Sequence, residues 1–183
     1  MSDSTEKKSL HPWRMPTPFC STLEVMEKMY PLVVMNSLTR TKTRFIPKDP
    51  NKVLWYQCGP TVYSDSHIGH ARTYVSLDII KRITKDYLNY NVVLVQNVTD
   101  IDDKIIIRSN EQKIPFDELA RKYEDEYNDD MLKLGVPPPD IVTRVSEFIP
   151  DIVKYIQVLV DKGIAYAAGG SVYFSTKDFE AQG

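Results

Sequence analysis

The sequence predicts an α/β fold built on a parallel sheet, and three observations carry this prediction. Residues 53–57 and 92–96 are apolar runs of the length that buried strands have. Residues 67–89 between them carry an apolar residue at every fourth position, which is typical of a helix. These positions are Val75, Ile79, Ile83 and Tyr87. Strand, helix and strand at this spacing form a βαβ unit, in which the strands run parallel and the crossover is right-handed.

The residues before this unit predict short elements. Residues 1–20 are polar, carry three prolines and are expected to form a loose arm. Residues 21–29 are typical of a short helix capped by Ser21 or Thr22. Residues 32–35 suit a strand, and a polar stretch follows them. The strand at residues 53–57 is apolar almost throughout, so we expect both of its faces to be covered.

Two helices are expected after the second strand. A short one spans residues 102–110, and Pro115 opens a longer, amphipathic one. One face of the longer helix is apolar, with Phe116, Leu119, Tyr123 and Tyr127. Its charged residues, from Asp117 to Asp130, are expected to form a solvated face, because pairs at this spacing contribute only tenths of a kcal/mol.

The last third of the chain predicts a helix and a hairpin. Three prolines at residues 137–139 interrupt regular secondary structure. An apolar pattern over residues 149–160 then predicts a helix that ends at Gly163. Residues 165–175 are typical of a β-hairpin that turns at Gly169 and Gly170. No further element is expected after the hairpin.

The composition is that of one ordinary globular domain. The chain has 183 residues, of which 42% are hydrophobic and 26% are charged. Its net charge of −2 excludes the global basic field that many nucleic-acid-binding domains carry, although a local basic patch stays open. With only Cys20 and Cys58, we expect no disulfide framework. No apolar run has membrane-spanning length and no leader pattern is visible, so we expect a cytoplasmic protein that does not contact membranes.

The start of the helix after the first strand is a candidate anion site. His67 and His70 lie three residues apart, on one side of the first turn, and Gly69 lets a ligand approach the backbone closely. Free N–H groups and the helix dipole favour phosphate there. The imidazoles can donate hydrogen bonds to a triphosphate and to charge that develops when its α-phosphorus is attacked. Two capping or surface histidines are the alternative, and the preceding strand and loop favour the anion site.

Cys58 is a candidate metal ligand. It follows the first strand directly, at the edge where open α/β sheets bind ligands, although a single cysteine is equally typical of a small buried apolar residue. Gly59 and Pro60 stiffen the turn after it. Zinc needs about four ligands, and Cys58, His67 and His70 are at most three. If the histidines bind phosphate, the remaining zinc ligands lie outside this chain.

The residues after the second strand allow two interpretations. Asp100, Asp102 and Asp103 could form a magnesium site. They are also typical of a helix start, where carboxylates in the first turn are stabilised by the dipole, and we favour this interpretation. Thr99, at the end of the strand, is a better candidate for a ligand contact than any of the three aspartates.

Three blocks of residues resemble the signature blocks of the cysteinyl-tRNA synthetase family. They are residues 58–63 (CGPTVY), 67–74 (HIGHARTY) and 97–106 (NVTDIDDKII). Residues 36–40 resemble that family's entry strand and turn. The strand with Trp55 and the long amino-terminal arm are more similar to eukaryotic than to bacterial members.

This resemblance implies a Rossmann-like class I synthetase catalytic domain with a parallel sheet. Residues 31–183 would be its amino-terminal part, up to the start of an inserted connective region, and residues 1–30 an arm before it. The implied activity is the activation of L-cysteine with ATP and Mg²⁺, followed by transfer to the tRNA for cysteine.

The resemblance also implies roles for single residues. His67, Gly69 and His70 match the ATP-binding motif, with the two histidines as catalytic residues. Cys58 matches a Zn²⁺ ligand of the cysteine pocket, and Gly59 and Thr99 match positions that line this pocket.

The sequence departs from the family in several ways. Ser64 stands where an aspartate is common, and the chain has no Lys-Met-Ser-Lys loop, no further set of zinc ligands and no anticodon-binding domain. We therefore expect a partial catalytic domain that is inactive alone. The alternatives are a non-catalytic nucleotide-binding or regulatory module on the same fold, and a related ligase that joins cysteine to an amino sugar.

Overall fold

The computed structural model describes residues 22–49 and 51–182, which form two compact units. Within this range the larger unit holds residues 22–35 and 42–147, and the smaller unit holds residues 36–41 and 148–182. The arm predicted for residues 1–20, and Ser21 as a capping residue, lie outside the described residues.

The larger unit contains the predicted parallel sheet. Its strands are β3 (Val53–Gln57), β4 (Val92–Val98) and β5 (Ile141–Arg144), in the order β3-β4-β5. Both pairs are parallel, with Val53 opposite Val92 and Val95 opposite Ile141. The two predicted strands and their direction are confirmed. The sequence did not predict β5, which has only four residues and follows three prolines.

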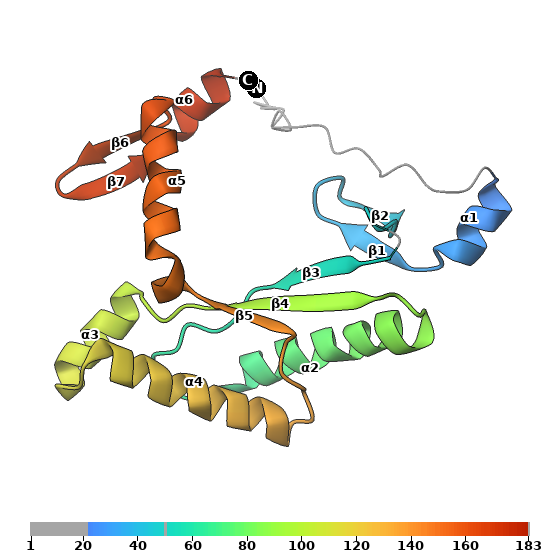
Figure 1. Ribbon diagram of the computed structural model, residues 1–183, viewed down its shortest axis with the longest axis horizontal. Helices are drawn as coiled ribbons and strands as arrows, with labels where there is room; N and C mark the ends of the chain where they lie inside the picture. The colour runs from blue at the N-terminus through green and yellow to red at the C-terminus, as the bar shows by residue number, and fades with distance from the viewer. Residues whose placement is uncertain (1–21, 50, 183) are drawn as a thin grey trace, which may run out of the picture. The chain divides into compact units, whose positions relative to one another are not determined.

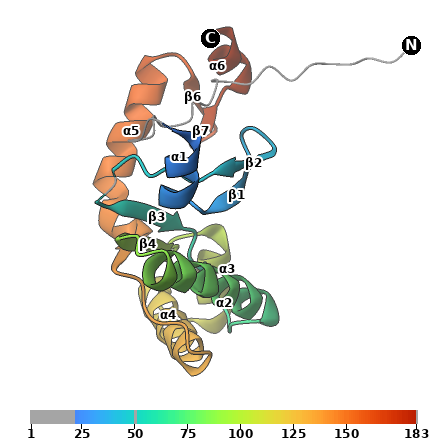
Figure 2. The same cartoon turned by 90° about the vertical axis from the view of Figure 1, so that its right-hand side faces the viewer.

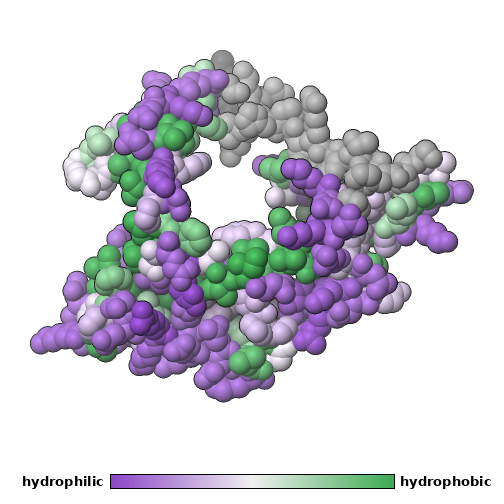
Figure 3. All heavy atoms as spheres, in the orientation of Figure 1, coloured by the Kyte–Doolittle hydropathy of each residue, from purple (hydrophilic) through white to green (hydrophobic). Residues whose placement is uncertain are grey.

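Helices cover one face of this sheet. They are α2 (Ile68–Arg82), which continues into a π-helical turn η1 (Ile83–Tyr87), α3 (Asp103–Gln112) and α4 (Phe116–Lys133). Figures 1 and 2 show α2 and α4 side by side below the strands. The described residues on the other face include no helix of this unit that packs there. Consequently Leu54 and Tyr56 of β3 are 67% and 61% exposed, and an apolar band is visible over the strands in Figure 3. The expectation that both faces of β3 are covered is therefore wrong for this unit.

The predicted apolar stripe of α2 is not the buried face of the helix. The buried residues of α2 and η1 are Tyr74, Asp78 and Thr84. Three of the four members of the stripe, Ile79, Ile83 and Tyr87, are exposed. A period of four residues identifies side chains that share a face, but it does not determine which face the sheet covers.

The predicted face of α4 is the buried one, with Phe116 as the exception. Leu119, Tyr123 and Tyr127 are buried, whereas Phe116 lies exposed in the first turn. Leu119 belongs to a core cluster below the carboxyl ends of the strands, whose buried members are Val62, Val98, Ile105, Leu119, Ala120 and Tyr123.

A second core cluster lies at the other end of the larger unit. The predicted first helix is α1 (Leu23–Met29), with Thr22 as its capping residue, although the Thr22 side chain makes no capping hydrogen bond. The strands β1 (Val33–Asn36) and β2 (Thr41–Arg44) pair with each other. β1 overlaps the strand predicted at residues 32–35, whereas β2 lies in the polar stretch that follows, where no strand was predicted. The cluster's buried members are Tyr30, Ile46, Val53, Tyr90 and Val92.

The smaller unit contains the predicted helix and hairpin. A short 3-10 turn η2 (Val145–Phe148) leads into α5 (Ile149–Asp161), and β6 (Ala165–Ala168) pairs antiparallel with β7 (Ser171–Phe174). Gly169 and Gly170 have φ of +57° and +80°, as a two-residue hairpin turn of the I′ type requires. The unpredicted helix α6 (Thr176–Ala181) follows, and the side chain of Ser175 caps it. None of the described helices combines the length and apolar character needed to cross a membrane.

Candidate active site

The carboxyl ends of β3 and β4 lie at one edge of the sheet and carry the predicted candidates. Cys58 follows β3 and Thr99 follows β4, and the strands run parallel in register. The pairing continues past both strands, because the Thr99 N–H donates to the Pro60 carbonyl at 3.0 Å and the Val62 N–H donates to the Thr99 carbonyl at 3.2 Å. The structure therefore brings the Cys58 loop and Thr99 together, as the sequence predicted.

Gly59 lies directly against the backbone of β4. Its N–H donates to Asn97 Oδ1 at 2.8 Å, and a Cβ atom at this position would lie 1.5 Å from the Asn97 carbonyl oxygen. Only glycine fits so close an approach. Sequence reasoning selected Gly59 but missed its partner Asn97, because the two residues are 38 positions apart.

The two histidines cap helix α2. The Nδ1 atom of His67 accepts from the N–H groups of Gly69 at 3.1 Å and His70 at 3.4 Å, and the His67 N–H donates to His70 Nδ1 at 3.3 Å. The rings are stacked, with centroids 3.9 Å apart. A Cβ on Gly69 would lie 2.8 Å from the His67 ring, so glycine leaves the space that this ring occupies. The capping interpretation is thus correct for one nitrogen of each ring.

Capping determines the tautomer of both rings. Because each Nδ1 accepts a backbone N–H, it carries no proton, and the proton of each neutral imidazole is on Nε2. The Nε2–H groups are free of any hydrogen bond to a described residue. Each ring therefore stabilises the helix with one nitrogen and presents a donor with the other, next to the positive end of the helix dipole. The capping and anion-binding interpretations are compatible.

Burial favours the neutral form of His70. Desolvation lowers the pKa of His70 below its ordinary value, and the neighbouring His67 lowers this pKa further. The rings of Tyr74 and Tyr127 lie 6.4 and 6.3 Å from the His70 ring. A neutral His70 keeps the Nδ1 acceptor that the cap requires.

A chain of buried polar groups supports the Cys58 loop from below. Tyr74 of α2 donates its hydroxyl proton to the Cys58 carbonyl at 3.1 Å. Gln57 Nε2 donates to Gln96 Oε1 at 3.0 Å, and Gln96 Nε2 donates to the Tyr127 hydroxyl at 3.3 Å. Sequence reasoning missed these four residues as site residues, because their partners are distant along the chain. Buried polar groups that are satisfied in this way restrict the loop to one geometry.

The described residues do not assemble a complete metal site. Among them no group of three or more His, Cys, Asp or Glu side chains is arranged to hold a metal ion. Cys58 is exposed and its thiol is free, so it could act as one ligand. Cys20 lies outside the described residues.

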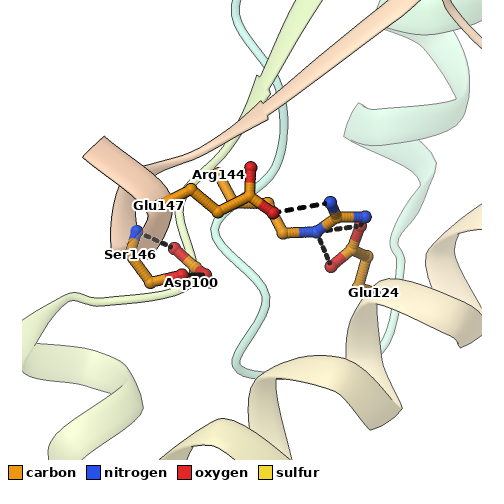
Figure 4. Close-up of polar contacts among 5 residues, drawn as sticks. All are labelled: Asp100, Glu124, Arg144, Ser146 and Glu147. Carbon is orange, nitrogen blue, oxygen red and sulfur yellow. Dashed lines mark hydrogen bonds and ion pairs between the residues drawn. The ribbon is translucent and has the colours of Figure 1, made fainter. Parts of the chain in front are cut away.

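Two of the three aspartates after β4, Asp100 and Asp102, have structural partners. Asp102 caps α3, as expected, by accepting from the Lys104 N–H at 2.9 Å. Asp100 does not cap α3, and that part of the prediction is wrong. Asp100 is buried and accepts from the N–H of Ser146 at 3.0 Å and from the hydroxyl of the same serine. This bond joins the end of β4 to the turn after β5 (Figure 4).

An ion pair beside Asp100 corrects a second expectation. Glu124 of α4 is buried, and its carboxylate accepts from Arg144 Nη2 at 2.7 Å and from Arg144 Nε at 3.0 and 3.1 Å. Arg144 also contacts Glu147 at 3.2 Å (Figure 4). The charged residues of α4 are therefore not all on a solvated face. These hydrogen bonds raise the pKa of Arg144, which stays charged.

Solved structures identify the class of the fold. The chain is similar to leucyl-tRNA synthetase from Agrobacterium radiobacter K84, in a ternary complex with tRNA and LeuAMS, with a TM-score of 0.56 and 19% identity over 66% of this chain and 16% of that one. It is also similar to Mycobacterium tuberculosis methionyl-tRNA synthetase bound by methionyl-adenylate, with a TM-score of 0.51 and 16% identity over 70% of this chain and 30% of that one. At these identities the likeness shows the fold, an α/β class I synthetase catalytic fold with a parallel sheet.

The family model for the tRNA synthetases class I (C) catalytic domain matches residues 44–183. The chain belongs to this family, and the resemblance inferred from the three sequence blocks is confirmed.

Curated relatives are named as cysteine–tRNA ligases. The chain is 48% identical to the cytoplasmic enzyme of Dictyostelium discoideum over 88% of this chain and 25% of the relative, and 50% identical to the enzyme of Encephalitozoon cuniculi over 81% of this chain and 31% of the relative. For the enzyme of Sulfurihydrogenibium sp. the identity is 46%, over 83% of this chain and 31% of the relative. The chain thus spans about a quarter to a third of the length of these relatives.

Proposed function

We propose that this chain carries the cysteine-activating site of a cysteine–tRNA ligase. In the first step a carboxylate oxygen of L-cysteine attacks the α-phosphorus of ATP, which forms cysteinyl adenylate and releases pyrophosphate. In the second step the 3′-terminal adenosine hydroxyl of the tRNA for cysteine attacks the adenylate carbonyl and releases AMP. The observation that carries the proposal is the pair of Nε2–H donors at the start of α2, beside the strand ends that hold Cys58 and Thr99.

The histidines would bind ATP and stabilise the charge that develops at its α-phosphate. The Nε2–H donors of His67 and His70 belong to the residues that begin α2, and the helix N-terminus favours phosphate. Donors that are already oriented require no rearrangement when charge develops, and removal of one such donor typically costs about 10²–10³ in rate. Gly69 contributes by leaving space for the His67 ring and for close approach of the phosphates.

Cys58, Gly59 and Thr99 would bind cysteine. The exposed thiol of Cys58 is suited to be one of about four zinc ligands. The other ligands would come from outside the described residues. Bound zinc would supply a soft Lewis acid that prefers the substrate thiolate to the hydroxyl of serine. Gly59 and Thr99 lie on the two adjoining strand ends, where the backbone of one is hydrogen-bonded to the other. We assign Mg²⁺ to the phosphates of ATP, because Asp100 and Asp102 already have structural partners.

We further propose that the chain does not complete aminoacylation by itself. It spans only a quarter to a third of the length of its curated relatives, so the rest of such a protein has room for the remaining zinc ligands and for tRNA contacts. We expect the protein in the cytoplasm, where the Dictyostelium relative is named as residing. A regulatory module would bind nucleotide without exchanging pyrophosphate, and an amino-sugar ligase would consume an amino sugar in place of tRNA.

Substitution of Cys58 by serine tests the proposed role of the thiol. In the full-length protein, Cys58→Ser should lower the zinc content and raise the KM for cysteine, while the KM for ATP stays within about twofold of the wild-type value, because the ATP-binding histidines are elsewhere. Metal analysis and ATP–pyrophosphate exchange measure these quantities. Unchanged zinc content and cysteine KM would refute the ligand role.

A separate pair of assays distinguishes a cysteine–tRNA ligase from a ligase that joins cysteine to an amino sugar. Aminoacylation of tRNA and ligation to an amino sugar are measured side by side.

A further inference from the structure

Asn97 of β4 connects the two halves of the candidate cysteine site. Its Oδ1 atom accepts from the Gly59 N–H at 2.8 Å and from the Tyr56 hydroxyl at 2.9 Å, and its Nδ2 atom donates to Thr99 Oγ1 at 3.4 Å. One amide group therefore contacts the residues on both sides of Cys58 and also the hydroxyl of Thr99.

The orientation of this amide is determined by its partners. The Gly59 backbone N–H can only donate, so the atom that faces it must be the Asn97 oxygen. The Asn97 nitrogen then faces Thr99. Since an amide nitrogen is only a donor, Thr99 Oγ1 is the acceptor in that bond, and the hydroxyl proton of Thr99 is directed away from Asn97.

We propose that Asn97 is a positioning residue of the cysteine site, which fixes the Gly59 backbone and turns the Thr99 hydroxyl outward as a donor to the substrate. The ligand atom that meets this hydroxyl is then an acceptor, and in a free amino acid the strongest acceptors are the carboxylate oxygens. This inference rests on the proposed function, since it names cysteine as the ligand.

The local backbone does not need Asn97 to hold the strand ends together. Two backbone hydrogen bonds, from Thr99 to Pro60 and from Val62 to Thr99, already join them. Glycine at position 59 brings the loop close enough for the amide to reach it. The three bonds of the Asn97 side chain are therefore additional to the sheet, and they converge on the residues assigned to substrate binding.

Two substitutions separate the two roles of Asn97. Asn97→Asp keeps an oxygen for Gly59 and Tyr56, but its second oxygen cannot donate, so the Thr99 hydroxyl must turn toward the carboxylate. Asn97→Ala removes all three bonds. In ATP–pyrophosphate exchange by the full-length protein, we expect Asn97→Asp to raise the KM for cysteine about tenfold, the effect of one lost hydrogen bond, and to leave the KM for ATP within about twofold.

A Thr99→Val background shows whether Asn97 acts through the hydroxyl. If it does, Asn97→Asp has no further effect on the cysteine KM in Thr99→Val, because the group that it reorients is absent. If the KM rises by the same factor in both backgrounds, the new charge acts directly on the substrate and the proposal is overturned. An unchanged KM in the single variant Asn97→Asp also overturns it.

Amide hydrogen exchange tests the tether to Gly59 without any substrate. In a peptide that covers residues 58–62, mass spectrometry should show exchange about tenfold faster in Asn97→Ala and unchanged in Asn97→Asp. Unchanged exchange in Asn97→Ala refutes the tether. If the wild-type protein shows no cysteine-dependent pyrophosphate exchange, the proposed activity is refuted, and with it the substrate role of Thr99. The amide hydrogen exchange experiment would still decide whether Asn97 positions Gly59.

Discussion

At the scale of single residues, His67 combines a structural task with the chemical task proposed for it. Its Nδ1 atom caps α2, so the ring is held with its Nε2–H group free. Asparagine also caps helices well but has no second ring nitrogen to donate. The two tasks can therefore be separated by substitution.

His67→Asn should keep the helix cap and lose the donor. We expect its free energy of unfolding within about 0.5 kcal/mol of the wild type, whereas His67→Ala loses about 1 kcal/mol with the cap. In both variants, cysteine-dependent ATP–pyrophosphate exchange should fall about 10²-fold, because a donor to the α-phosphate is lost. Urea unfolding measures the first quantity. A His67→Asn variant with the full exchange rate would show that Nε2 has no role in the reaction.

His70 should make the folded chain sensitive to mild acid. Its pKa is lowered in the folded state by burial and by His67, so the unfolded chain binds its proton first as the pH falls. The stability contributed by neutral His70 is complete above the ordinary pKa of about 6.5 and is lost as the pH falls through the lowered value. The loss of unfolding free energy between pH 7 and 5 should be smaller in His70→Asn than in the wild type. An equal loss in both proteins would contradict the assignment.

The sequence predicted the positions of those candidate site residues that depend on local structure. Cys58 and Thr99 follow strands and His67 begins a helix, and each of these features can be recognised from a few neighbouring residues. Asn97 and Tyr74 could not be found in this way. Asn97 accepts from Gly59 and Tyr56, which are 38 and 41 residues away, and Tyr74 donates to Cys58, which is 16 residues away. These contacts form only once the strands are paired and α2 is packed.

At the scale of elements, an ion pair attaches β5 to α4. Arg144 lies at the end of β5 and Glu124 is buried on α4, so the pair fixes the third strand of the sheet against its helix. The same turn is held by the bond from Ser146 to Asp100. A buried carboxylate that loses its cation is costly, because neither water nor another charge compensates it.

Arg144→Met should destabilise the larger unit by about 2 kcal/mol, a figure reduced from that of a fully buried pair because Arg144 is partly exposed. Glu147→Gln, which removes only the exposed partner of Arg144, should change stability by less than about 0.5 kcal/mol. Glu124→Leu combined with Arg144→Met should recover part of the loss, since no charge is then left buried. Urea denaturation measures all three, and equal effects of Arg144→Met and Glu147→Gln would disprove the buried pair.

Several elements were predicted and others could not be. The βαβ unit, the face of α4 and the hairpin at Gly169 and Gly170 follow from periodicity and turn chemistry. The strand β5 is short, follows three prolines closely and pairs in parallel with β4, a partner that the local sequence does not indicate. The stripe on α2 predicted the helix but not its buried face, because the polar residues Asp78 and Thr84 are buried on the side of the larger unit's core.

At the scale of the whole molecule, the chain belongs to the tRNA synthetase class I (C) catalytic domain family and matches relatives that are much longer. It spans a quarter to a third of the length of its curated relatives, and its net charge of −2 gives no general attraction for RNA. Composition excluded a global basic field, but it could not indicate two units or an exposed sheet face, which depend on the folded arrangement.

The most direct test of the proposed function is the amino-acid dependence of ATP–pyrophosphate exchange by the full-length protein with zinc present. We predict exchange that requires cysteine, that serine supports at least about 10⁴-fold less well, and that falls about 10²-fold in His67→Asn. Exchange that is absent with cysteine, or equally fast with serine, would contradict the assignment of this sheet edge to cysteine activation.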